Sequence, residues 1–96
     1  MKITEFQRKT YNKTIDHIAA FIPDEGITGA DLLTVIEFCV KSMPDNEVDA
    51  LFDISGAGRI DRHKMFDRNE KEMAVGMALL SIIMKAVTED GEDEQK

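Results

Sequence analysis

The feature that most constrains the fold of this chain is an almost uninterrupted apolar segment near its C-terminal end. From Met73 to Val87, only Gly76, Ser81 and Lys85 interrupt the apolar residues. At 100° per residue, small and polar residues share one narrow face of the resulting helix, and larger apolar residues cover the rest. A helix that is apolar over most of its circumference must be buried on several sides. The segment therefore predicts either the central helix of a bundle or the seam of an oligomer.

Apolar residues at helical spacing predict two further helices, over about residues 5–21 and 28–42. Pro23 and Gly26 follow the first helix and turn the chain. Pro44 ends the second helix, because the residue before a proline avoids helical geometry. In each helix the apolar residues recur at steps of three and four, and the two stripes are Tyr11, Ile15, Ile18 and Ile22, then Leu32, Ile36, Cys39 and Met43.

Residues that cap helix ends indicate where three of the helices begin. Thr4 precedes Gln7 by three positions, which is the spacing of a capping box. Asn69 and Glu72 have the same spacing at the start of the last helix, which should continue to about residue 87. Thr28 is a capping residue at the start of the second helix, where an acidic residue three positions later favours the helix dipole.

A shorter helix is expected between the second helix and the last one. Asp45 or Asn46 can cap it, and its apolar residues are Val48, Leu51 and Phe52. No strand-like alternation of useful length appears in the chain. The sequence therefore predicts an all-α fold, a small bundle of four to five helices with a largely buried C-terminal helix. We expect a single domain over residues 1–88 and a disordered acidic tail over residues 89–96.

Composition places this chain among globular proteins of a reducing compartment. It is 43% apolar and 32% charged, and its lone cysteine, Cys39, excludes an internal disulfide. The first residues, Met1 to Lys13, are polar and contain no apolar core of a signal peptide. The apolar segment near the C-terminus is shorter than the ~20 residues that a membrane-spanning helix needs. We expect a soluble cytoplasmic protein that does not enter a membrane.

The net charge of −7 limits the kinds of partner that this chain can bind. Binding to a phosphate backbone depends on Lys and Arg, so direct binding of nucleic acid is not expected. An acidic surface permits a protein partner with a basic surface, or electrostatic mimicry of nucleic acid. The acidity can equally serve only to keep a small domain soluble.

The loop from Asp53 to Lys64 resembles the calcium-binding loop of the EF-hand family. It departs from the family pattern at its third and fifth positions, where it has Ser55 and Ala57. At the last position, where the family has a bidentate Glu, the lysine places a positive charge instead. No metal is therefore predicted, and a helix–loop–helix without calcium stays open. The matching residues are Phe52, Asp53, Gly58, Ile60 and Asp61.

No set of residues points to catalysis or to a cofactor. The turn at 56–59 lacks the third glycine and the Lys-Ser/Thr pair of the nucleotide-binding fingerprints. His63 lies near Asp61 and Asp67, but a His and an Asp four positions apart more often stabilise a helix surface. His17 is isolated, and Cys39 has no histidine next to it in sequence that could activate it. We therefore expect no catalytic, cofactor or metal site, and no enzyme.

The expected function is a non-enzymatic protein-binding module, a small acidic adaptor or inhibitor that docks on a basic surface of a larger protein. Phage and mobile-element accessory proteins offer an analogy for such short acidic chains. The alternative is a homo-oligomeric structural protein or an assembly chaperone that self-associates through the helix over residues 70–88. The residues expected to bind a basic partner combine negative charge with one aromatic side chain, and they are Glu37, Phe38, Asp45, Glu47 and Asp49.

Overall fold

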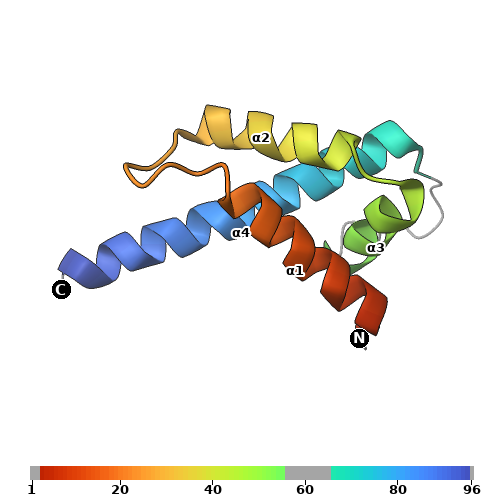
Figure 1. Cartoon of the computed structure of the whole chain (residues 1–96), viewed down its shortest axis with the longest axis horizontal. Coiled ribbons are helices and arrows are strands. Elements are labelled where there is room, and N and C mark those ends of the chain that lie inside the picture. Colours follow the sequence, from red (N-terminus) through yellow and green to blue (C-terminus); the bar gives the residue numbers. More distant parts are fainter. Residues whose placement is uncertain (1–2, 56–65, 96) are drawn as a thin grey trace.

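In the computed structural model of this chain, the described backbone consists of helices joined by irregular segments and contains no strand. The structure describes residues 3–55 and 66–95, with side chains as far as residue 86. This part confirms the predicted all-α fold and contains four helices (Figure 1). They are α1 (Glu5–Ala19), α2 (Gly29–Lys41), α3 (Asp45–Ser55) and α4 (Arg68–Gln95).

The first two helices begin where their capping residues predicted. The Thr4 hydroxyl accepts from the backbone amide of Gln7 at 3.1 Å, and the Gln7 side chain accepts from the Thr4 amide at 3.0 Å. The Thr28 hydroxyl accepts from the backbone amide of Asp31 at 3.1 Å. Each bond satisfies an amide that has no partner inside its helix. The short-range sequence pattern is therefore sufficient to place both helix starts.

The other two helices begin slightly earlier than predicted. Asp45 is the first residue of α3 instead of its cap, and the carbonyl of Pro44 accepts from the amide of Val48 at 3.2 Å. In α4 the reciprocal capping pair is Asp67 with Glu70, at 2.8 and 3.2 Å, two positions before the expected pair of Asn69 with Glu72. Both sites offer the same chemistry, so local spacing alone does not decide between them.

The core lies where α2 and α3 pack against α4 and α1 packs across α3 and α2 (Figure 1). The predicted stripe of α2 is confirmed: Leu32 and Ile36 are fully buried and Cys39 is nearly so. Of the stripe predicted over residues 5–21, only Ile18 is fully buried, and its other members pack partly against the core. The buried apolar residues that join the four helices are Ile18, Leu32, Ile36, Val40, Val48, Leu51, Val75 and Leu79.

The long C-terminal helix packs into the core on one side, and it is longer than predicted. Val75 and Leu79 of α4 are buried in the core, but the opposite side of this helix is exposed. The helix also continues to Gln95, and its C-terminal end extends past the ends of the other three helices (Figure 1). The domain boundary at residue 88 stays a prediction. In the described part of the chain, no helix combines the length and apolarity that crossing a membrane requires.

Candidate functional site

The five residues predicted to bind a partner lie on two helices and in two different environments. Glu37 and Phe38 are neighbours on α2, and both are exposed, with Phe38 at 69%. Glu37 forms no ion pair with any residue in the ranges 3–55 and 66–86. The three predicted acidic residues on α3 are each paired with a basic residue elsewhere in the chain. The predicted set therefore does not form one free acidic surface.

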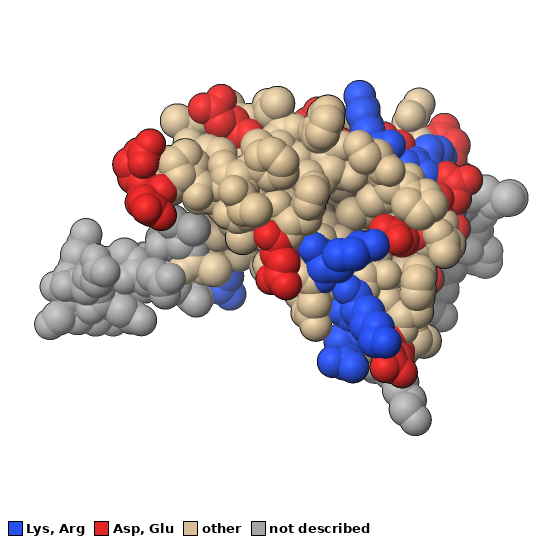
Figure 2. Space-filling view, in the orientation of Figure 1, with Lys and Arg blue, Asp and Glu red and all other residues tan. Residues whose placement is uncertain are grey.

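The acidic side chains of α3 connect this helix to its neighbours. Glu47 accepts from Lys13 of α1 at 2.9 Å, and Asp49 accepts from Lys71 of α4 at 2.7 Å. Acidic and basic side chains accordingly lie next to one another on the face in Figure 2. Pairs that remain partly in water stabilise a fold by about 0–1 kcal/mol each. Their main consequence is that a basic partner would have to compete with the chain's own lysines.

Arg68, the first residue of α4, completes these connections between helices. It pairs with Asp45 of α3 and donates to Glu72 of its own helix at 2.6 Å. It also donates to the backbone carbonyls of Val40 at 3.3 Å and Met43 at 2.7 Å, which closes the end of α2. The hydrogen bond to Glu72, followed by that to Asp45, raises the pKa of Arg68. An arginine in the first turn opposes the helix dipole, so sequence rules did not identify this role.

The exposed side of α4 forms an apolar stripe, which we call the outer face and define as Met73, Met77, Leu80 and Met84. These residues recur at steps of four, three and four, the spacing of a coiled-coil seam. Met73 is 72% exposed and Met77 58%, whereas Leu80 is half-buried. No ionisable residue occurs between Met73 and Met84. The outer face is therefore an uncharged apolar surface on an acidic protein.

A surface hollow of about 540 Å³ adjoins the outer face, between α2 and α4. Leu33 of α2 and the two exposed methionines of α4 line it, and Glu37 and Lys41 also border it. A Cβ placed on Gly76 would lie 3.9 Å from Cγ2 of Ile36, at ordinary contact distance. Packing therefore does not require a glycine here. We call this feature the α2–α4 hollow.

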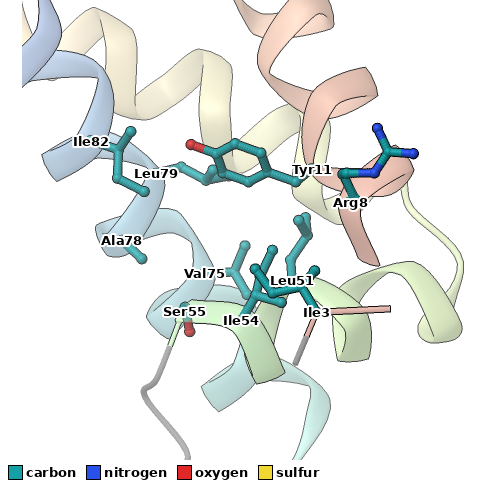
Figure 3. A pocket seen from close by; sticks show the side chains of 10 residues that line it. All are labelled: Ile3, Arg8, Tyr11, Leu51, Ile54, Ser55, Val75, Ala78, Leu79 and Ile82. Carbon is teal, nitrogen blue, oxygen red and sulfur yellow. The ribbon is translucent and has the colours of Figure 1, made fainter. Parts of the chain in front are cut away.

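A second hollow, of about 340 Å³, lies between α1, α3 and α4 (Figure 3). The ring of Tyr11 extends toward Leu79, while the guanidinium of Arg8 points away from the other side chains shown. The described residues that line this hollow include no carboxylate and no histidine, so they offer no acid–base pair. The remaining lining residues are Ile3, Leu51, Ile54, Ser55, Val75, Ala78 and Ile82.

Two of the groups that were considered for metal or nucleophilic chemistry, His17 and Cys39, line one hollow of about 300 Å³ together with Glu47. Burial raises the pKa of the Cys39 thiol, which keeps it protonated and unreactive at neutral pH. His17 is exposed and packs edge-on against Phe21, with 5.5 Å between ring centroids. Within the described ranges, no three His, Cys, Asp or Glu side chains gather as metal ligands. His63 and residues 56–64 of the EF-hand-like loop lie outside the described residues, and Asp53 lies within α3.

Comparisons with known proteins do not supply a function for this arrangement. No family model, no curated protein and no solved structure matches the chain. Of the surfaces described above, the outer face of α4 is the one on which neighbouring large apolar side chains are left exposed without compensating charge.

Proposed function

We propose that this chain is a non-enzymatic assembly protein, in which the outer face of α4 binds the outer face of a second copy. The observation that carries this proposal is the exposure of Met73 and Met77 on a stretch of α4 that has no ionisable residue between positions 73 and 84. Neighbouring apolar side chains that stay in water favour a surface at which they become buried. Methionine side chains suit such an interface, because their flexible chains adapt to the shape that they meet.

The energetics favour a dimer that depends on protein concentration. Complete burial of one fully exposed methionine side chain contributes roughly 1.5–3 kcal/mol. Two from each copy therefore contribute at most about 6–12 kcal/mol, because Met73 and Met77 are already partly covered. Association costs about 4–15 kcal/mol in lost translational and rotational freedom. The two sums are similar, so the outer face alone supports weak association. The α2–α4 hollow beside it adds apolar surface that a second copy can cover.

The net charge of the chain predicts whether self-association becomes stronger or weaker as the salt concentration rises. Each copy carries −7, so two copies repel one another at a distance. Salt screens this repulsion over a Debye length of ~8 Å at physiological ionic strength, so dimerisation should become stronger as salt rises. Docking of the same acidic chain on a basic partner should instead become weaker.

Sedimentation velocity at increasing protein concentration and at two salt concentrations tests the proposal. The natural chain should shift from monomer to dimer, and the shift should occur at lower concentration in high salt. The double variant Met73→Lys with Met77→Lys should stay monomeric and folded by circular dichroism. A matched control, Phe38→Lys, places a charge at an equally exposed position outside the outer face and should dimerise as the natural chain does. A natural chain that stays monomeric at high micromolar concentration contradicts the proposal.

A second candidate is the acidic adaptor that docks on a basic protein surface. Its supporting observation is the exposed pair Glu37 and Phe38 on α2, which combines a free carboxylate with an exposed aromatic ring. The variant Glu37→Lys with Phe38→Ala should lose such a partner, whereas the double variant of Met73 and Met77 should retain it. The opposite pattern in matched pull-downs favours assembly through α4.

A further inference from the structure

We infer that the two copies of α4 run antiparallel, so that the C-terminal half of each helix covers the α2–α4 hollow of the other copy. This inference names the geometry of the partner and rests on the self-assembly proposed above. Three features of the chain lead to it: the extent of α4, the symmetry of its outer face, and the distribution of charge along it.

α4 is longer than each of the other three helices that the structure describes. Its 28 residues span about 42 Å at 1.5 Å per residue. The C-terminal part extends past the other three helices, and Ile82 and Met84 are exposed there (Figure 1). Parallel copies would pair these extended halves only with each other. Antiparallel copies place each extended half on the body of the partner, where Met73 and Met77 are exposed.

The outer face matches itself when one copy is reversed. Dimers of identical chains are most often two-fold symmetric, with the same patch contributed by each copy. A two-fold axis near the middle of the stripe places Met73 opposite Met84 of the partner subunit, and Met77 opposite Leu80 of the partner subunit. All four residues of the outer face then find apolar partners. The α2–α4 hollow, which Met73 and Met77 line, receives the second half of the stripe.

Charge also distinguishes the two directions. Residues 89–96 contain five acidic residues and one lysine. Parallel copies would bring the two acidic ends together, at a cost from like-charge repulsion. Reversal instead places the two acidic ends at opposite ends of the helix pair, which avoids this repulsion.

Disulfide trapping separates the two directions, because a disulfide requires Cα atoms about 4.4–6.8 Å apart. Chains that carry Met73→Cys and differently tagged chains that carry Met84→Cys are oxidised separately and as a mixture. In the antiparallel arrangement the mixture forms a mixed disulfide at least several-fold faster than either chain pairs with itself. The exposed variant Asn12→Cys on α1 measures random collision. The natural chain, whose only cysteine is the buried Cys39, is the negative control and should form no disulfide.

The outcomes keep this inference distinct from the proposed function. If Met73→Cys pairs mainly with itself while sedimentation shows a dimer that depends on Met73 and Met77, the antiparallel inference is wrong and the assembly proposal stands. If no trapped dimer exceeds the Asn12→Cys background although a dimer sediments, the contact lies elsewhere and the inference is equally wrong. If the natural chain sediments as a monomer, the assembly proposal itself fails.

Discussion

The acidic residues of α3 and the outer face of α4 both belong to segments that the sequence assigned to a partner. In the structure, however, their surroundings differ. Asp45, Glu47 and Asp49 are each paired with a basic residue of a neighbouring helix. Met73 and Met77 have no comparable cover within the described chain. Long basic side chains can reach a carboxylate across a helix–helix contact. An apolar side chain on the far side of a helix is covered only where another segment packs against it, and Met73 and Met77 stay exposed in the part of the chain that the structure describes.

The sharpest test of this contrast compares the two sides of α4. Leu79→Ala removes a buried side chain and should lower the free energy of unfolding by about 2–5 kcal/mol. Met77→Ala, on the outer face, should change it by less than about 0.5 kcal/mol when measured at low concentration, where the chain is monomeric. Urea unfolding followed by circular dichroism measures both values. Equal losses would mean that the outer face is covered within one chain.

The next largest effect should come from Arg68, which joins three helices. Arg68→Met keeps most of the apolar length of the side chain but removes its hydrogen bonds to Asp45, Glu72 and the carbonyls at the end of α2. We expect a lower midpoint of urea unfolding, by less than for Leu79→Ala because the guanidinium is partly in water. A midpoint equal to that of the natural chain would contradict a role for Arg68 in fixing the ends of α2 and α3.

Two charge reversals compare the contribution of an ion-paired glutamate to stability with that of an unpaired one. Glu47→Lys replaces the partner of Lys13 by a second lysine and should lower the free energy of unfolding by about 1 kcal/mol. Glu37→Lys changes the net charge equally, but at an exposed position without an ion pair among the described residues, so it should have almost no effect. Raising the salt concentration should reduce the difference between the variants. If Glu37→Lys costs as much, net charge and not pairing governs stability.

The smallest expected effect concerns the close approach of α2 to α4. Gly76→Ala should raise the free energy of unfolding by about 0.5–1 kcal/mol, because alanine favours a helix more than glycine does. The added Cβ meets Ile36 at an ordinary contact distance, so no strain opposes this gain. Thermal unfolding of the two chains measures the difference. A loss of stability would show that α2 lies closer to α4 than the structure places it.

Much of the fold could be predicted from local patterns, but less of the candidate site. The caps at Thr4 and Thr28 and the buried stripe of α2 were correct, because capping and helical periodicity depend only on residues a few positions apart. The starts of α3 and α4 were shifted, since similar capping residues compete within two positions. The internal pairing of Asp45, Glu47 and Asp49 could not be predicted, because their basic partners are distant in sequence.

The sequence by itself determined that this protein is helical and that the helix after residue 68 has more apolar surface than one neighbour can cover. Only the tertiary structure decided which side of that helix is covered. Helical periodicity states which residues share a face, but the face that is buried depends on where α2 and α3 cross α4. These crossings bury Val75 and Leu79 and leave Met73 and Met77 in water. The surface available to a partner is thus a consequence of packing, which no local pattern contains.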